Sequence, residues 1–507
     1  RRCGVRADRL FALGRADPND SRAPFNLAFV AARGSAHING VSELHGRVSK
    51  SIFAALYPGW PEAEIPITHV TNAVHVPSWD SPWADRVWTE ACGKDRWRGE
   101  PRALEQAVAH LSDAQLWDFR AMERRDLVDY ARRRLQRHLS QRGETQDQIS
   151  RARDAFDPNV ITLGFARRFT EYKRPTMLLE QADRLIALLT NPDRPVQLLI
   201  AGKAHPRDEL GASFVQRWAV FTRRPEVRQR VVFLEDYDMT LAEHLVQGVD
   251  VWINTPRRPW EASGTSGMKV LVNGGLNVSE LDGWWAEAYS PELGWALGDG
   301  NEHTEPEWDD IETEQLFRIL EEEVVPEFYD RNEDGIPVAW VARIRASLSQ
   351  LTPRFSSNRM LGEYVERLYR PAAAASRRRL GHNLQVAREL QAWRDQLRRH
   401  WQEIHWGNLV VSSEGDQNSF AVQLYLGEIE PDTVKVQLYA DPELPGAPAD
   451  VRDMTRDHAL SGAAGGFVYQ ARLPAGRAAD CYTPRVVPYH PEAAVPSEVT
   501  CISWYPR

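Results

Sequence analysis

The sequence predicts an α/β protein built on a parallel β-sheet and followed by a small antiparallel β domain, which we expect to be a sandwich. Two patterns carry this prediction. After Pro158, apolar runs of strand length alternate with amphipathic helical stretches, and these runs lie at 160–165, 196–201, 231–234 and 251–253. Toward the end of the chain, polar and apolar residues alternate in runs separated by turn residues, at 420–426, 434–439, 467–473 and 482–487.

Helical patterns precede, separate and follow the strand runs. Residues 35–51 are expected to form a helix of mixed polarity and 65–79 a loop, and 111–141 is the clearest helical pattern. Its arginines lie on the face opposite the apolar residues, so we expect them to be solvated. The other expected helices are 176–189, 209–221, 241–247, several within 309–369, and 383–404, with 371–380 as a linker.

Composition narrows the class of protein and its partners. The chain has 507 residues and a formal net charge of −9, which argues against bulk nucleic-acid binding. No apolar run approaches the roughly 20 residues that a membrane-spanning helix needs. No CxxC pair occurs, so we predict no cysteine zinc site and no dense disulfide framework, as is typical of a reducing cytoplasm; the four cysteines are Cys3, Cys92, Cys481 and Cys501.

Parallel sheets bind ligands at the carboxyl ends of their strands, so the segments that follow the strand runs are the candidates for chemistry. The first such segment, Arg167–Arg174, contains four cationic residues within eight positions. Arginine can clamp a phosphate as a fork and lysine can bind it as a point charge. A salt-bridged surface turn is the alternative interpretation.

The second candidate, Glu261–Lys269, is a run of small residues that ends in a lysine. Small residues let the backbone approach a ligand, and a Gly/Ser/Thr loop that opens a helix presents free N–H groups to an anion. Lys269 is then either a phosphate ligand or an amine desolvated enough to hold an aldehyde as an imine. An ordinary first helical turn is the alternative, and the missing Gly-Lys-Ser/Thr ending does not match a Walker P-loop.

Two further segments follow strand runs. Glu235, Asp236 and Asp238 could orient sugar hydroxyls, although helix capping is the simpler interpretation. Asp282 precedes the pair Trp284-Trp285, and core packing is the simpler interpretation for at least one of these tryptophans.

Taken together, these segments resemble the α-glucan phosphorylase family (the glycogen, starch and maltodextrin phosphorylases), and most closely its short, bacterial-type branch. Glu-Ala-Ser-Gly-Thr-Ser-Gly-Met-Lys at 261–269 resembles the family's pyridoxal phosphate segment, which ends in the lysine that binds the cofactor. Arg-Arg-Phe-Thr-Glu-Tyr-Lys-Arg at 167–174 resembles its phosphate-site segment. The resemblance covers roughly residues 24–370, and more weakly the β tail.

The resemblance implies roles for individual residues. Arg168 and Lys173 match the residues that hold the substrate phosphate, and Lys269 matches the cofactor lysine. The cofactor pyridoxal 5′-phosphate would also contact Gly264, Thr265, Ser266 and Tyr237. The positions that match sugar contacts are Asn72, Glu261, Ser263 and Gly264, together with His37.

The sequence also departs from the family pattern. Ala36 occupies the position of a histidine, with His37 one place later, and Thr170 and Ala73 replace a histidine and a glycine. The family's amino-terminal Gly-rich loop is not found in this chain. We therefore expect the chain to correspond to the carboxyl-terminal part of a phosphorylase. The expected division is 1–75 as a remnant of the amino-terminal catalytic domain, 76–370 as a cofactor- and phosphate-binding domain, 371–404 as a linker and helix, and 405–507 as the β domain.

The resemblance implies a Rossmann-like, doubly wound sheet, the carboxyl-terminal domain of a two-domain GT-B glycosyltransferase fold. It implies reversible phosphorolysis of α-1,4-glucans such as glycogen, starch or maltodextrin by inorganic phosphate, with retention, in a cytoplasmic enzyme. Members of the family are commonly dimers, so the resemblance also implies a homodimer. It implies neither a metal nor a nucleic-acid or membrane partner. The alternatives are an inactive phosphorylase-like binding or scaffold protein and a nucleotide-sugar glucosyltransferase of the same fold, which would not need an imine-forming lysine at position 269.

Overall fold

The computed structural model describes residues 6–98, 102–444 and 447–506, so that Cys3 lies outside the described residues. The chain divides into two compact units. The sheet unit comprises Gly40–Gly46 and His69–Tyr364, and the tail unit comprises the residues up to Asn39, Arg47–Thr68 and the residues from Val365 onward.

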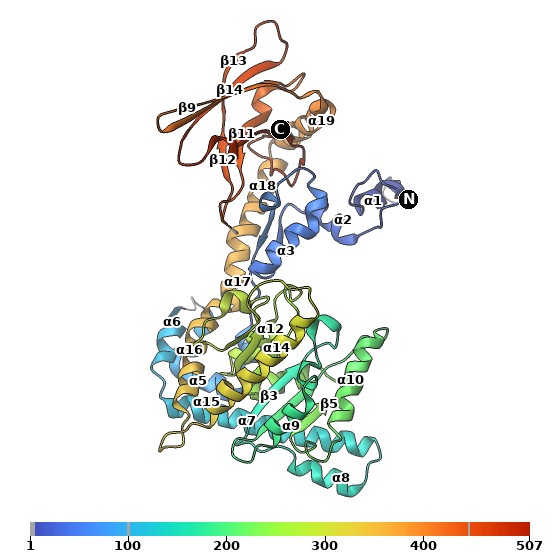
Figure 1. Ribbon diagram of the computed structural model, residues 1–507, viewed down its shortest axis with the longest axis vertical. Helices are drawn as coiled ribbons and strands as arrows, with labels where there is room; N and C mark the ends of the chain where they lie inside the picture. Colours follow the sequence, from blue (N-terminus) through green and yellow to red (C-terminus); the bar gives the residue numbers. More distant parts are fainter. Residues whose placement is uncertain (1–5, 99–101, 445–446, 507) are drawn as a thin grey trace. The chain divides into compact units, whose positions relative to one another are not determined.

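The sheet unit is built on a six-stranded parallel sheet of order β5-β4-β3-β6-β7-β8. This is the order of a doubly wound Rossmann-type sheet, and it reverses between β3 and β6. Figure 1 labels β3 and β5 among the helices α7 (Asp113–Gln141), α9 (Ala182–Thr190) and α10 (Glu209–Phe221). The strands are β3 (Ile161–Ala166), β4 (Val196–Ala201), β5 (Val231–Leu234), β6 (Val251–Asn254), β7 (Leu276–Glu280) and β8 (Trp295–Leu297).

The central strands are apolar because helices cover both faces of the sheet. Every residue of β3 and β4 is buried, and the two strands pair in parallel with Leu163 opposite Leu198. The predicted α/β class with a parallel sheet is therefore confirmed, and the predicted runs match β3 to β6 within one residue.

The helix predicted at 111–141 is α7 (Asp113–Gln141), and Ser112 and Gln115 form a capping box at its start. The expectation that its arginines are solvated is wrong for Arg120, Arg124 and Arg134, which are buried. Each of them satisfies backbone carbonyl groups or a buried carboxylate that the sheet would otherwise leave without donors. Arg120, for example, donates to the carbonyl oxygens of Val249 and Asn273.

The remaining helices of the sheet unit surround this sheet. The helix expected at 176–189 instead consists of a short 3-10 turn, Met177–Leu179, followed by α9 (Ala182–Thr190), because Gln181 has non-helical backbone angles, φ −120° and ψ 58°. The other helices are α4 (Val76–Trp79), α5 (Pro82–Cys92), α6 (Arg102–Ala109), α8 (Gln146–Arg151), α9 (Ala182–Thr190), α10 (Glu209–Phe221), α11 (Met239–Gly248), α12 (Thr265–Leu271), α13 (Trp285–Ala288), α14 (Glu307–Arg318), α15 (Val325–Tyr329), α16 (Val338–Arg354) and α17 (Ser357–Tyr364).

The tail unit contains two four-stranded antiparallel sheets, of order β13-β14-β10-β9 and β12-β11-β15-β16. Phe420 and Val422 from one sheet and Val436 and Leu438 from the other share one apolar core, as predicted for a sandwich. The strands are β9 (His405–Glu414), β10 (Gln417–Tyr425), β11 (Val434–Ala440), β12 (Asp450–Asp453), β13 (Thr455–Ala459), β14 (Gly466–Pro474), β15 (Thr483–Pro488) and β16 (Ser503–Trp504).

Three sequence predictions outside the sheet are corrected. The expected linker 371–380 is α18 (Arg370–Leu380), because four consecutive alanines favour a helix and Pro371 stands in its first turn, where a missing N–H costs nothing. The expected helix 35–51 is a strand, β1 (Ile38–Gly40), followed by α3 (Glu43–Phe53). The expected loop 65–79 contains β2 (Ile67–His69), which pairs with β1, and α4. The other helices near the chain's start and in the tail are α1 (Ala7–Leu13), α2 (Leu27–Gly34) and α19 (Gln385–His400).

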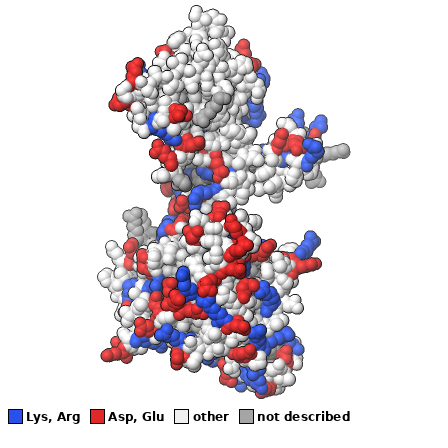
Figure 2. Space-filling view, in the orientation of Figure 1, with Lys and Arg blue, Asp and Glu red and all other residues white. Residues whose placement is uncertain are grey.

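Figure 2 shows basic and acidic side chains intermixed over the visible face. Within the described ranges, no helix is long and apolar enough to cross a membrane. In the same ranges, no group of three or more His, Cys, Asp or Glu side chains is placed to hold a metal ion.

Candidate active site

The candidate site lies where the strand order reverses, between β3 and β6. Doubly wound sheets bind their ligands in the crevice that opens outside the carboxyl ends of the strands at this point. The segment after β3 carries Arg167, Arg168 and Lys173, and the segment after β6 leads to Glu261. The fold therefore brings together the two segments that the sequence analysis selected separately.

The Glu261 carboxylate joins these two segments. Its Oε2 accepts hydrogen bonds from Lys173 Nζ at 2.8 Å and from Arg167 Nη2 at 2.6 Å. All three side chains are largely buried. Burial alone would raise the pKa of Glu261, but the two cations outweigh it and hold that pKa below its ordinary value.

The turn after β7 fixes the backbone of the Glu261 loop. Asp282 Oδ2 accepts a hydrogen bond from the Glu261 backbone N–H at 2.8 Å, and the Trp284 N–H donates to the Ser263 carbonyl at 2.8 Å. Gly283 lies between them with φ +52°, and a Cβ atom there would stand 2.4 Å from the Ser263 oxygen, so that no side chain fits. Burial raises the pKa of Asp282 to about 7.

Lys269 projects from α12, the short helix that follows Gly264, which has φ +86°. Its Nζ lies 3.7 Å from the centre of the Trp79 indole ring, and among the described residues it has no hydrogen bond and no carboxylate partner. Burial lowers the pKa of the Lys269 amine. In the loop before α12, the hydroxyl of Ser263 is buried and has no hydrogen-bond partner among the described residues.

The two cations predicted to hold a phosphate differ in environment. Lys173 is buried and already bonded to Glu261, whereas Arg168 is exposed. Among the residues that the structure describes, none forms a hydrogen bond or ion pair with the Arg168 side chain. Of these two cations, Arg168 is therefore the one that has charge available for an anion.

Tyr237, predicted beside the cofactor, follows β5 and is half-buried. Burial raises the pKa of its phenol, and the positive charge of Arg167 partly opposes this rise. Ser266 Oγ accepts a hydrogen bond from Trp252 Nε1 at 3.1 Å. Thr265, beside it, begins α12 and is half-buried.

The two remaining predicted sugar contacts are Asn72 and His37. Asn72 is half-buried in the sheet unit, where its backbone N–H donates to the Val41 carbonyl at 3.0 Å and its own carbonyl accepts from Arg359. His37 is exposed and belongs to the tail unit, so it is not placed relative to the other predicted site residues.

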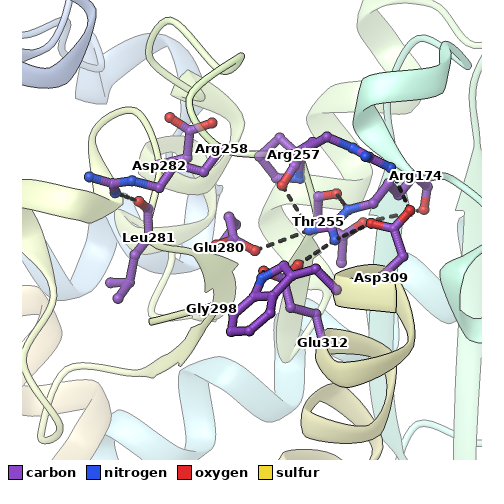
Figure 3. A network of polar contacts seen from close by, with 12 residues as sticks. Arg174, Thr255, Arg257, Arg258, Glu280, Leu281, Asp282, Gly298, Asp309 and Glu312 are labelled. Atoms are coloured by element: carbon purple, nitrogen blue, oxygen red, sulfur yellow. Dashed lines mark hydrogen bonds and ion pairs between the residues drawn. The ribbon is translucent and has the colours of Figure 1, made fainter. Parts of the chain in front are cut away.

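Arg174, next to Lys173, anchors a buried ionic network that sequence reasoning missed (Figure 3). Its guanidinium binds Glu280 at 3.1 Å and Asp309 at 3.1 Å, and also pairs with Glu312. Burial and the negative charge of the nearby Glu312 raise the pKa of Glu280 well above its ordinary value. This network fixes the end of the phosphate-site segment.

Two more residues at the site were missed. Asn254, the last residue of β6, accepts a hydrogen bond from Arg167 through Oδ1 and donates to Ser279 Oγ at 2.9 Å. Trp260 is 67% exposed, and its ring lies 6.2 Å from that of Tyr172. The one available signal was its position directly before Glu261.

Fold and site thus define a class: a Rossmann-type α/β protein with a cationic cluster and a lysine-bearing small-residue loop at the switch point of its sheet. Residues 17–290 match the family model described as carbohydrate phosphorylase, and residues 401–506 match that of the glycogen phosphorylase C-terminal domain. The chain belongs to the carbohydrate phosphorylase family, as its motifs predicted.

Curated relatives agree with this assignment. A glycogen phosphorylase of Mycobacterium tuberculosis is 39% identical over 99% of this chain and 58% of its own length. A maltodextrin phosphorylase of Thermococcus litoralis is 32% identical over 96% of this chain and 57% of its own length. A glycogen phosphorylase of Aquifex aeolicus is 37% identical over 72% of this chain. The chain therefore spans somewhat more than half the length of the first two relatives.

Proposed function

We propose that this chain forms the cofactor- and phosphate-binding part of an α-1,4-glucan phosphorylase. In this reaction inorganic phosphate displaces the terminal α-1,4-linked glucose as glucose 1-phosphate, with retained configuration, and the shortened glucan takes up the proton. The observation that carries the proposal is the amine of Lys269, which is half-buried and has no carboxylate partner among the described residues. It projects from the helix that follows β6, one of the two strands between which the strand order reverses.

The residues around Lys269 fit pyridoxal 5′-phosphate. An amine must be neutral to react with an aldehyde, and burial without a carboxylate partner favours the neutral form of Lys269. The orphaned hydroxyl of Ser263 has hydrogen-bonding capacity to offer a polar ligand. When bound, this cofactor would supply a phosphate group that exchanges a proton with the substrate phosphate.

The proposed roles of the chain's own residues follow from their positions. Lys269 would hold the cofactor aldehyde covalently, with Tyr237 beside it, and the backbone N–H groups of Gly264, Thr265 and Ser266 would bind its phosphate. Arg168 and Lys173 would bind the substrate phosphate. Glucose hydroxyls would be bound by Glu261, Ser263, Gly264 and Asn72, and His37 remains a further candidate.

Charge repulsion explains why the site needs its cations. Two unit charges 4 Å apart repel by about 4 kcal/mol at an effective dielectric constant near 20, and two phosphates carry more than one charge each. Arg168, with no partner among the described residues, and Lys173 would offset this repulsion. The close approach would also bring a phosphate pKa toward neutrality, which a proton shuttle requires.

We further infer that the sheet unit is the carboxyl-terminal half of a GT-B fold. The remaining glucan-binding and catalytic residues would be provided by the part of the relatives' length that this chain does not span. A homodimer is compatible with this proposal. A scaffold role without turnover and a nucleotide-sugar glucosyltransferase are the competing functions, and two successive experiments separate all three.

The experiment traps the lysine. The chain is incubated with pyridoxal 5′-phosphate, reduced with borohydride and digested, and the peptides are searched by mass spectrometry for a pyridoxyl group. We expect the label on Lys269, none in Lys269→Arg, and full labelling in the control Lys94→Arg, which alters an exposed lysine. A chain without label on Lys269 would refute the cofactor assignment and leave the glucosyltransferase alternative.

Turnover is then measured as glucose 1-phosphate formed from maltodextrin and phosphate. A labelled chain that forms glucose 1-phosphate supports the phosphorylase. A labelled chain that forms none, even when the remaining length of a relative is supplied in trans, supports the scaffold role instead.

A further inference from the structure

A cavity of about 540 Å³ lies at the open edge of the parallel sheet, two strands away from the switch point. It is lined by the ends of α7 and α10, by α8 and by β5, which pairs with β4 alone. Successive strand residues point to opposite faces, so a cavity that touches Val231, Val232 and Phe233 lies along the strand's edge. Its volume is within the range of pockets that bind small organic ligands.

One wall of this cavity is apolar. Leu135 and Leu139 from α7 and Phe233 from β5 line it, and each is only partly buried by the protein. Ala152 and Ala155 line the same cavity and are buried, and because their side chains are small they leave its volume open to a ligand. A ligand with an apolar body would remove this wall from water, which contributes roughly 25 cal/mol of favourable binding free energy per Å² of apolar surface covered.

The rim of the cavity has an excess of positive charge. Its lining includes four arginines, Arg142, Arg151, Arg223 and Arg228, but only two acidic residues, Glu144 and Glu235. Arg142 pairs with Glu235, and Arg151 pairs with Asp147 on its own helix.

The other two arginines have no such partner. Arg223 and Arg228 lie on the connection from α10 to β5, and neither side chain has a hydrogen bond or ion pair with any described residue. Two guanidinium groups next to an apolar wall are suited to an anionic group attached to an apolar body, because charge-assisted hydrogen bonds and burial then act on one molecule.

We propose that this cavity is a binding site for a small organic anion, whose aromatic or aliphatic body packs against Leu135, Leu139 and Phe233 and whose carboxylate, sulfonate or phosphate group binds Arg223 and Arg228. A neutral ligand would leave the two guanidinium groups without a counter-charge, and an inorganic anion would leave the apolar wall in water. The site is independent of the proposed phosphorylase reaction, since none of its lining residues belongs to the candidate active site.

The test compares two dyes that share an apolar body. The sulfonate 1-anilinonaphthalene-8-sulfonate carries the anionic group, and N-phenyl-1-naphthylamine lacks it. Fluorescence titration of the chain is expected to show one saturable site for the sulfonate. The double variant Arg223→Gln/Arg228→Gln should raise the Kd of the sulfonate at least about tenfold, which is the effect of losing one charge-assisted bond. It should leave the neutral dye's Kd unchanged.

Two further variants complete the design. Arg194→Gln/Arg207→Gln removes the same charge from exposed positions outside the cavity and should leave the sulfonate's Kd unchanged. Ala219→Trp places an indole in the cavity and should abolish saturable binding of both dyes while circular dichroism stays that of the parent chain. Equal weakening by the two arginine pairs, or undiminished sulfonate binding in Ala219→Trp, would overturn the proposal.

Discussion

Lys173 donates a hydrogen bond to Glu261 at 2.8 Å, although 88 residues separate them in the chain. The proposed function assigns the lysine to the substrate phosphate and the carboxylate to the sugar. In the structure each is the other's partner, and Arg167 is the third member of the cluster. Under the proposed function, binding of phosphate and sugar would redistribute these bonds, and the charge of Glu261 would set how tightly the two cations are held beforehand.

Replacing Glu261 by Gln tests this cluster. The amide keeps the size of the side chain but leaves two buried cations without a counter-charge, which typically costs about 3 kcal/mol of unfolding free energy. We expect urea denaturation at neutral pH to show a loss of this order, together with loss of turnover. The exposed Glu171→Gln is the matched control and should change the unfolding free energy little.

The destabilisation caused by Glu261→Gln is expected to depend on pH. The pKa of Glu261 is lowered in the folded state, so its stabilisation is fully present above the unfolded value of about 4.3 and is lost as pH falls through the folded value. The unfolding free energies of the parent chain and Glu261→Gln should therefore converge in acid. A difference between them that stays constant from neutral pH into the acid range would rule out an ionised Glu261 as the cause.

Arg168 is predicted to act on phosphate alone. Because its guanidinium is exposed and has no partner among the described residues, Arg168→Gln should leave folding and cofactor labelling intact. Loss of one charge-assisted bond should lower kcat/KM for phosphate about 10- to 100-fold. Initial rates at limiting and saturating phosphate measure this, with Arg194→Gln as the control; unchanged rates at limiting phosphate would contradict the role.

The sequence allowed the parallel sheet to be predicted because its strands are buried on both faces and so are apolar throughout. Val196–Ala201 has this pattern and is β4. The helix α7 was predictable for its periodicity, but the burial of Arg120 was not. Burial of Arg120 depends on backbone carbonyl groups of Gln247 and Asn273, and no local sequence pattern in α7 indicates that these groups lie nearby.

The site was predicted in its parts but not in its connections. Lys269 and Lys173 stood out because small residues and clustered charges are uncommon after strands. That Glu261 would neutralise Lys173, or that Asp282 would hold the Glu261 backbone, depends on the register of β6 beside β7. Such long-range geometry is set by the packing of the whole sheet, which local propensities do not encode.

Lys269 is predicted to be needed for cofactor retention and not for folding. Its Nζ contacts the Trp79 ring and has no ion pair within the described residues, so Lys269→Ala removes a cation–π contact, worth about 1 kcal/mol. We expect the variant to fold and to lose pyridoxal phosphate on gel filtration, followed by the cofactor's absorbance. Retention equal to that of Lys94→Ala would show that binding does not depend on Lys269.

Asp282 gives the last prediction, because burial raises its pKa to about 7 in the folded chain. Between about pH 4 and 7 the folded state keeps a proton that the unfolded state releases, so the unfolding free energy contributed by this group falls as pH rises through that window and is level above it. The shift sets an upper bound on the order of 4 kcal/mol. Asp282→Asn can still accept the Glu261 N–H through its amide oxygen but cannot titrate, so its unfolding free energy should fall less than the parent's from pH 4 to 7. Urea denaturation at each pH measures this, with the exposed Asp193→Asn as the control. Parallel curves for the parent and Asp282→Asn would contradict the prediction, because they would mean that Asp282 is ionised throughout this pH range in the folded chain, as Glu261 is at neutral pH.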